Sequence, residues 1–497
     1  MGKKYFNNFL RYAIMFVLIL LFIYSAGYIG YNVYKSNSKL LIVVLAVFYA
    51  ALIYFYKRYS SRLLKMVSLI SHSKLLTYIL VSAFILRLLW ILVVPTVPAS
   101  DFKLMYEYAK EASQGNYYGF HDYAYFARFT HDTITVLYFS LFYRIAENPL
   151  FIIKLFNVIF QTISVYGIYL ICKELFDKNR ALISTFVIAF FPPFIMYTAQ
   201  TMSENMAMPL YLFSVYFFIA VIKGKISSLY LLLCGLTLSF ANMFRMVGTI
   251  FIIAYIMYTV IYIGFIKGFK NSILILIGFM VPFYLVSQAL LSANITETHL
   301  WKSKEPSITS ILKGTNIKEH GKFNLEDAEL PDKLNHDPEK IKEASKKIIV
   351  DRLTKTPAPK LVFHYIKKLA MQWGMGDFRA AAWTIENSND TAMGKSLKYI
   401  LYDICFFSQL IYLAILVRIF KAIKNNDYID IEEVNFFYIL FGGFVLLLLI
   451  TEFQERYAFI VSWLFVIFTT RISRASDYKV FPSESVKNNS TKKPVNY

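Results

Sequence analysis

The segment "ALISTFVIAFFPPFIMYTAQTMSENMAMPLYLFSVYFFIAVI", residues 181–222, holds two long apolar runs separated by a short polar break. Each run is close to the roughly 20 residues that an α-helix needs to cross the hydrocarbon core of a bilayer. Glu204, which lies in the break, is the one charged residue of the segment. The pattern therefore predicts two membrane-spanning helices joined by a short turn that carries a carboxylate.

The same pattern recurs along the 497-residue chain, in which 57% of the residues are hydrophobic and 18% are aromatic. Repeated apolar runs of this length are typical of an all-α polytopic membrane protein. We expect about twelve crossings, at residues 12–33, 39–56, 75–95, 150–171, 181–200, 203–222, 227–243, 248–266, 271–292, 398–418, 434–451 and 457–471.

The formal net charge of +20 follows the same layout, because the Lys and Arg residues gather in short clusters between the apolar runs. Such clusters are typical of the cytoplasmic face of a membrane protein, and we expect no nucleic-acid partner. With the N-terminus inside, the cytoplasmic segments hold 21 Lys and Arg residues and the short outer loops hold 4. This asymmetry predicts a multi-pass protein of the cell membrane with both termini in the cytoplasm.

Four regions follow from this topology. Residues 1–292 form a transmembrane module whose first outer loop is 96–149, and residues 293–397 form an extracytoplasmic, mainly helical soluble region. Residues 398–471 hold the last transmembrane helices, and 472–497 form a polar tail expected to be disordered. We expect 132–149 to lie along the outer surface as a helix, because counting it as a crossing would invert every later loop against the charge bias.

Charged residues next to a bilayer are costly, so those that occur there usually have a partner or a function. Six of them fall at the outer ends of predicted crossings, although they come from distant parts of the chain: Asp101, Glu204, Arg245, Glu452, Glu455 and Arg456. The bilayer places all six at one surface, and we expect a functional site there. Considered alone, Glu204 needs no role beyond complementing a helix dipole, and Arg245 needs none beyond extending toward the lipid headgroups.

Four motifs, in this order along the chain, resemble one family of membrane enzymes. They are "PASDFKLMYEYA" (98–109), the run 152–216 with its "FPP" and outer "SE", "LLLCGLTLSFANMFRMVG" (231–248) and "EFQERYAFI" (452–460). Together they resemble the polyprenyl-phosphate-sugar-dependent glycosyltransferases with the C-type membrane fold (GT-C). That superfamily contains the protein O-mannosyltransferases and the bacterial lipid A aminoarabinose transferase, members of or similar to glycosyltransferase family 39. Phe102 stands where many mannosyltransferases carry a second acid, which leaves the sugar and the acceptor open.

The resemblance implies an inverting transferase that moves a sugar from a polyprenyl phosphate to an acceptor glycan, lipid or protein at the extracytoplasmic face. In that reading Asp101 is the general base, since an acceptor hydroxyl or amine is a weak nucleophile until it loses its proton. Arginines suit the phosphate of the donor through paired hydrogen bonds. The expected phosphate ligands are Arg245, Arg456 and Arg128, and the expected sugar or acceptor ligands are Glu204, Asp122 and Tyr106.

Two further questions stay open at the sequence level. His121, Asp122 and His131 are suitable ligand types for a divalent metal ion in one loop, but they lack the close spacing of a recognised metal motif. A lipid-linked sugar flippase or transporter is one alternative function, for which inverted repeats and charges near the membrane midplane would be expected. An enzyme similar to the O-antigen polymerases and ligases is another, and its site would lie in the large outer loop.

Overall fold

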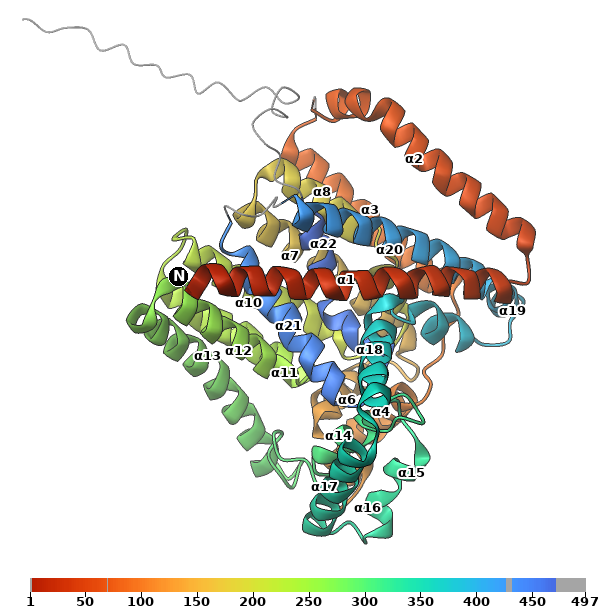
Figure 1. Cartoon of the computed structure of the whole chain (residues 1–497). Helices are drawn as coiled ribbons and strands as arrows, with labels where there is room; N and C mark the ends of the chain where they lie inside the picture. The colour runs from red at the N-terminus through yellow and green to blue at the C-terminus, as the bar shows by residue number, and fades with distance from the viewer. Residues whose placement is uncertain (1, 69, 426–430, 471–497) are drawn as a thin grey trace, which may run out of the picture.

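The protein is an all-helical bundle in a computed structural model that describes residues 2–68, 70–425 and 431–470. Within these ranges there is no strand, only an isolated bridge between Thr96 and Ser388 (Figure 1). The predicted tail 472–497 lies outside the described residues. The sequence-based expectation of an all-α protein is confirmed for the described chain.

Among the described residues, six helices are long and apolar enough to cross a membrane. They are α1 (Gly2–Lys35), α3 (His72–Val93), α7 (Leu150–Leu175), α10 (Glu204–Ile222), α13 (Phe265–Ser292) and α20 (Leu401–Lys424). Shorter apolar stretches lie in α2 (Lys39–Ser68), in η4 (Ser228–Tyr230) with α11 (Leu231–Phe244), in α12 (Gly248–Tyr258) with η5 (Thr259–Ile263), and in α21 (Val434–Ile450). The layout with twelve crossings stays a prediction.

A seventh candidate crossing is bent by 63° between α8 (Lys178–Ala189) and the pair α9 (Pro192–Met196) and η3 (Tyr197–Ala199). Pro192 opens α9, and a proline disfavours helical geometry in the residue before it, so the break falls where the sequence "FPP" demands it. Buried Arg87 of α3 donates from Nη1 to the carbonyl oxygen of Ala189 at 3.0 Å. This contact stabilises a carbonyl at the end of α8, where helix acceptors lack partners.

Short helices fold the first outer loop into a compact layer: α4 (Asp101–Ser113), η1 (Tyr118–Phe120), α5 (Tyr125–Arg128), η2 (Thr130–Asp132) and α6 (Thr133–Tyr143). Helix α6 packs against α4 through buried residues such as Val136 and Phe139. It occupies the stretch for which a surface helix was predicted, and it is shorter than the 132–149 expected.

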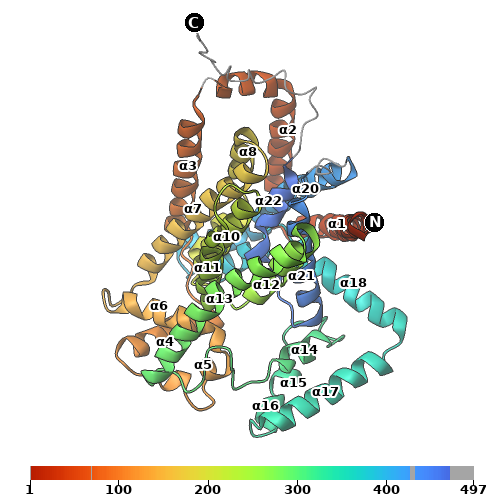
Figure 2. The ribbon, with the colours of Figure 1, turned by 90° about the vertical axis from the view of Figure 1, so that its left-hand side faces the viewer.

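The region 293–397 holds α14 (Ile308–Gly314), α15 (Leu325–Ala328), α16 (Leu330–Lys333), α17 (Pro338–Lys355), α18 (Ala358–Gly374), η6 (Ala382–Glu386) and the start of α19 (Ala392–Tyr399). The carboxylate of Asp337 caps α17 by accepting from the amides of Glu339 and Lys340, as an Asp-Pro start predicts. Figure 2 shows α14–α17 and α4–α6 on opposite sides below the bundle. The chain ends its described part with η7 (Glu455–Val461) and α22 (Trp463–Thr469).

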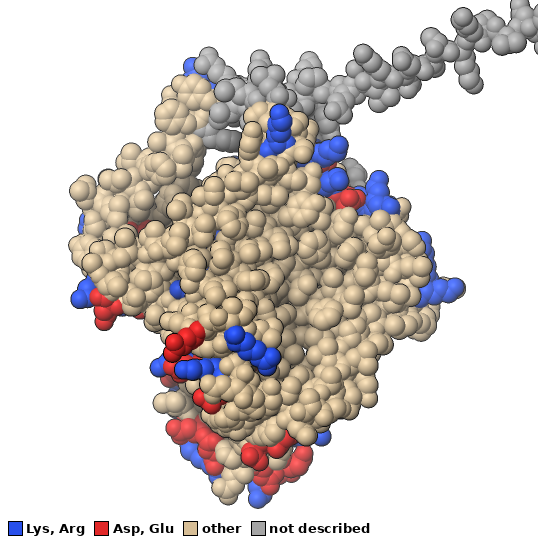
Figure 3. All heavy atoms as spheres, turned by 180° about the vertical axis from the view of Figure 1, so that it is seen from behind, with Lys and Arg blue, Asp and Glu red and all other residues tan. Residues whose placement is uncertain are grey.

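One continuous hydrophobic core joins the bundle, with α10 in contact with α7 and α11, and α11 in contact with α13. Seen from behind, the charged side chains gather near the lower end and along the upper margin, and most of the surface between them carries no charge (Figure 3). An uncharged belt of this kind is what a bilayer requires of the protein surface that it covers.

The crossing of α11 and α13 depends on two glycines. A Cβ on Gly235 would collide with the carbonyl oxygen of Ile275, and one on Gly278 would collide with that of Leu232. Close approach of two backbones through small residues is a common way for membrane helices to pack. The two helices can therefore be this close only while both positions lack a side chain.

We expect Gly235→Ala or Gly278→Ala to destabilise the protein by about 1–3 kcal/mol, because the backbones must separate to fit the methyl group. Thermal unfolding of the purified protein in detergent measures the effect. Gly442→Ala in α21 is the control, since nothing lies within 4 Å of its Cβ position. Equal unfolding temperatures for all three variants would contradict this account of the crossing.

Candidate functional site

A buried arginine and a partly exposed carboxylate meet where α4 lies next to η7. Nη2 of Arg456, in η7, donates to Oδ2 of Asp101 at 2.9 Å, and its Nε donates to Oε1 of Gln454 at 2.8 Å. The guanidinium lies over the rings of Phe102 and Trp383, at 4.6 and 4.7 Å from their centroids. The side chain of Arg456 is 7% exposed, whereas that of Asp101 is 36% exposed. The arginine therefore holds an acid that solvent and ligands can reach.

A second acid–arginine pair lies beside the first. Nε of Arg245 is 3.3 Å from Oε1 of Glu204, which is buried at the start of α10. The ring of Tyr457 connects the two pairs, because the guanidinium of Arg245 is 5.2 Å from its centroid and that of Arg456 is 5.4 Å from it. The structure thus brings together four of the residues singled out in the sequence.

Asp132 is a further acid near this cluster, and the sequence analysis did not assign it a role of its own. Its carboxylate is buried at the start of α6, and burial raises its pKa against the opposing effects of His131 and Arg245. Burial also raises the pKa of the neighbouring Tyr125 phenol, and Asp101 and Asp132 add to that rise. Three polar groups of the first outer loop therefore converge beside the arginines, a convergence that only the folded loop reveals.

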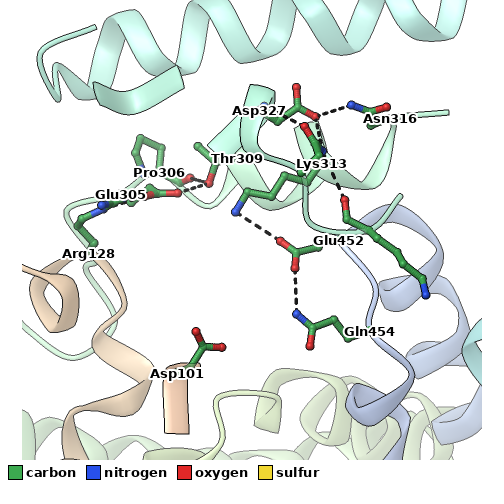
Figure 4. A network of polar contacts seen from close by, with 12 residues as sticks. Asp101, Arg128, Glu305, Pro306, Thr309, Lys313, Asn316, Asp327, Glu452 and Gln454 are labelled. Atoms are coloured by element: carbon green, nitrogen blue, oxygen red, sulfur yellow. Dashed lines mark hydrogen bonds and ion pairs between the residues drawn. The ribbon is translucent and has the colours of Figure 1, made fainter. Parts of the chain in front are cut away.

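A cavity of about 780 Å³ lies next to the cluster and reaches it at Tyr457, and we call it the basic cavity. Tyr457 lines it together with Arg128 and with residues of α14 and α17. In Figure 4, the carboxylate of Asp101 points toward a space bounded on one side by Arg128 with Glu305 and on the other by Lys313 with Glu452. Arg128 donates from Nε and Nη2 to the same oxygen of Glu305, at 3.0 and 2.7 Å.

A second cavity, of about 470 Å³, lies next to the same pair. Ser100 and Gln454 line it. Ser100 precedes Asp101 in the sequence, and Gln454 accepts a hydrogen bond from Arg456. Arg379 also lines it and has a backbone φ of 64°, in a turn that Asp377 holds by accepting from two backbone amides. Arg379 was not among the site residues predicted from the sequence, because no helical or motif pattern marks a strained turn. Residues next to the Asp101–Arg456 pair therefore line two cavities, Tyr457 the first and Ser100 with Gln454 the second.

The other predicted ligands lie away from the pair in this structure. Asp122 is exposed, with a φ of 50°, and its amide donates to Glu297. The hydroxyl of Tyr106 donates to Asn148 at 2.8 Å. His121 contacts the carbonyl oxygens of Asn294 and Ile295 through Nε2.

The same loop does not gather metal ligands. Nε2 of His131 is 3.7 Å from a carboxylate oxygen of Asp132, while His121 and Asp122 contact the segment 294–297. Across the residues that the structure describes, no group of three or more His, Cys, Asp or Glu side chains is placed to hold a metal ion. The proposed metal ligands therefore stay separate.

The region 293–397 holds the segment that carries Arg456. The amides of Glu452 and Phe453 donate to the carbonyl oxygens of Ser310 and Gly321, at 2.7 and 3.0 Å. Gly314 packs so closely on Ile450 and Thr451 that a Cβ there would collide with their backbone. We call these contacts the clasp, and they fix the chain just before η7.

Ion pairs and a buried lysine complete the clasp. Nζ of Lys313 is 3.3 Å from Glu452, and Nζ of Lys322 is 2.8 Å from Glu455. Fully buried Lys368 donates to the carbonyl oxygens of Gly314, Leu449 and Thr451 at 3.0, 2.8 and 2.6 Å. Since the last carbonyls of a helix lack partners within it, Lys368 satisfies the end of α21 just before the site.

We expect Lys368→Met to destabilise the protein by at least about 2 kcal/mol, because it leaves buried carbonyl oxygens without donors. Lys367→Met is the matched control, since Lys367 is partly exposed and contacts His320 instead. Thermal unfolding in detergent compares the two variants. Similar losses for both would show that the clasp does not depend on Lys368.

Comparison with known proteins bears on these residues. Residues 132–291 match the family model of the dolichyl-phosphate-mannose-protein mannosyltransferases, a range that includes Glu204 and Arg245. No curated protein matches the chain. The family match confirms the resemblance to the mannosyltransferase and aminoarabinose-transferase superfamily. Residues 132–291 are thus similar to the membrane glycosyltransferases of the mannosyltransferase type.

Proposed function

We propose that this protein transfers a sugar, with inversion, from a polyprenyl phosphate to an acceptor at the extracytoplasmic face of the cell membrane. The observation that carries the proposal is the Asp101–Arg456 pair, whose direct neighbours line two cavities: Ser100 and Gln454 line one, and Tyr457 lines the other. A transfer between two substrates needs a reactive group that both can reach, and the pair lies between the residues that line the two cavities. The twelve-crossing topology, with both termini in the cytoplasm, belongs to the same proposal.

Asp101 acts as the general base. Its Oδ2 accepts from Arg456, its Oδ1 accepts from the hydroxyl of Ser100 at 3.4 Å, and the carboxylate also accepts from the phenol of Tyr125. Oδ1 takes the proton of the acceptor hydroxyl or amine as that group attacks the anomeric carbon. The bond from the anomeric carbon to the donor oxygen breaks, and its electron pair leaves with the polyprenyl phosphate. Attack opposite the leaving group in one displacement inverts the anomeric configuration.

The arginines stabilise the charge that develops on the leaving phosphate. Arg456 uses Nη2 and Nε for protein acceptors, and Arg245 meets Glu204 through Nε. The remaining guanidinium N–H groups make no hydrogen bond within the described residues and can bind phosphate oxygens. Both guanidinium groups lie against Tyr457, which lines the basic cavity, so phosphate can reach them from there.

An enzyme explains the arrangement better than a flippase does. A flippase that moves a lipid-linked sugar needs polar groups along a path through the bilayer. Here both acid–arginine pairs and both cavities lie with the loops at one end of the helices. Incubation with a panel of labelled polyprenyl-phosphate sugars tests the choice, because transfer removes the label from the lipid and transport leaves it there.

Asp101→Asn should lower turnover by about 10²–10⁴-fold, because the amide cannot accept the proton of the acceptor. Labelled-sugar transfer by the purified variant measures the loss, and its unfolding temperature checks that it has folded. Glu107→Gln makes the same chemical change on an exposed acid of α4 and should leave turnover unchanged. Turnover of Asp101→Asn at the wild-type rate would remove this residue from the base role.

Arg245→Ala and Arg456→Ala should each lower kcat/KM for the donor by about tenfold or more, since a charge-assisted hydrogen bond contributes about 1.5–3 kcal/mol. Arg456→Lys keeps the charge but loses the planar pair of donors, so only partial activity should return. Exposed Arg144 provides the control as Arg144→Ala. Unchanged donor kinetics in both alanine variants would rule out the proposed phosphate site.

A further inference from the structure

We propose that the basic cavity selects a polyanionic acceptor, a glycan or polyol chain with phosphodiester groups, and that the lysines of α17 bind it. The inference rests on the proposed function, because it names the class of acceptor for the same site. It goes beyond that function in giving α17 a role in recognition.

The walls of the cavity come from four distant parts of the chain, one of which holds Glu452 and Tyr457. Arg128 and Phe129 belong to the first outer loop, Trp301 and the following residues lead into α14, and Lys342 and Lys346 lie on α17. In Figure 4, Asp101 points toward the space between Arg128 and Lys313, two residues that line the cavity. A chain lying across α17 can therefore extend one of its hydroxyl groups toward the base.

The charges of the lining residues are not balanced at the α17 side. The cavity is lined by five cationic side chains, from Arg128, Lys302, Lys313, Lys342 and Lys346, and by three acids, Glu305, Glu343 and Glu452. Glu305 and Glu452 are neutralised by Arg128 and Lys313. This leaves Glu343 as the single acid facing Lys302, Lys342 and Lys346, so the cavity entrance carries a positive surplus.

The surplus lysines are available to a ligand. In the part of the chain that the structure describes, Lys302 and Lys346 have no carboxylate within 4 Å of Nζ. Lys342 pairs with Glu339 at 2.7 Å, but both side chains are more than half exposed, and such a pair contributes little. A phosphodiester can therefore bind these ammonium groups without breaking a buried contact.

The spacing along α17 suits a repeating anion. Lys342 and Lys346 are four residues apart, which puts them on one face of the helix with a separation of about 6 Å along its axis. Lys302 adds a third cation from the segment that leads into α14. A neutral acceptor would gain nothing from this row of charges, whereas a chain with a phosphate in each repeat can contact several of them at once.

The experiment measures binding without requiring turnover. The full-length protein in nanodiscs is titrated against fluorescent poly(glycerol phosphate) and against uncharged polyglycerol of the same length, and fluorescence polarisation gives Kd. The phosphate polymer should bind more tightly, and added salt should weaken it. The double variant Lys342→Gln with Lys346→Gln should raise its Kd about three- to tenfold.

A second pair of lysines on α17 provides the matched control. Lys347 has no carboxylate within 4 Å among the described residues, Lys355 pairs with Asp351 at 3.1 Å, and neither lines the cavity. Lys347→Gln with Lys355→Gln removes the same charge and should change Kd less than twofold. Equal losses in the two double variants, or equal affinity for the two polymers, would overturn the proposal. Equal competition by phosphatidylglycerol vesicles at matched phosphate would also overturn it, in favour of a lipid headgroup.

The two proposals fail in different ways. Asp101→Asn should still bind poly(glycerol phosphate), because the base is not among the lysines that hold it. If the polymer binds as described but no labelled sugar leaves any polyprenyl-phosphate donor, the proposed transferase reaction is wrong and the anion site stands. If sugar is transferred equally well to both polymers, the reaction stands and the acceptor class is wrong.

Discussion

The structure depends on the need to neutralise Arg456. An arginine side chain stays protonated under any condition at which a protein is folded, and a buried cation without a partner is very unfavourable. At 7% exposure the guanidinium needs acceptors close by, and Asp101 supplies a charged one from 355 residues earlier in the chain. The rings of Phe102 and Trp383 lie against the guanidinium, and the side chain of Asp101 stays 36% exposed. One contact thus orders the first outer loop against the last one.

That contact can form only if the backbone before Arg456 is held in place, and this explains why the region 293–397 packs where it does. The clasp bonds the amides of Glu452 and Phe453, and Lys368 binds the carbonyl oxygens of Leu449 and Thr451 just before them. The same region supplies α17 to the wall of the basic cavity. It therefore serves the site in two ways, because it positions the arginine through backbone contacts and lines the space in which a substrate would lie.

The sequence was sufficient to predict the all-α class and the meeting of Asp101, Glu204, Arg245 and Arg456, because the bilayer restricts charged residues to its surfaces and so brings distant loops together. It was not sufficient to predict which loop residues turn toward the site. Asp122 and Asp132 are both acids of one polar stretch, yet the first is exposed and the second is buried beside the arginines. The difference arises from short helical turns and a positive φ at Asp122, features that leave no periodic pattern. The role of Lys368 could not be predicted from the sequence either, since it depends on carbonyl oxygens from other segments.

The resting charge balance of the site restricts how substrates can enter it. Each of the three arginines expected to bind phosphate already has a carboxylate partner: Asp101 for Arg456, Glu204 for Arg245 and Glu305 for Arg128. A donor phosphate must use the donor groups that these pairs leave free, because separating a buried pair would leave an acid unpaired in a medium of low dielectric constant. The surplus of positive charge lies farther out, on the exposed lysines around α17, where an anion can be attracted at little cost. Such a site attracts anions through its exposed lysines and holds its arginines and Asp101 in fixed positions deeper inside. Substrate binding then need not rearrange the charges of these buried pairs.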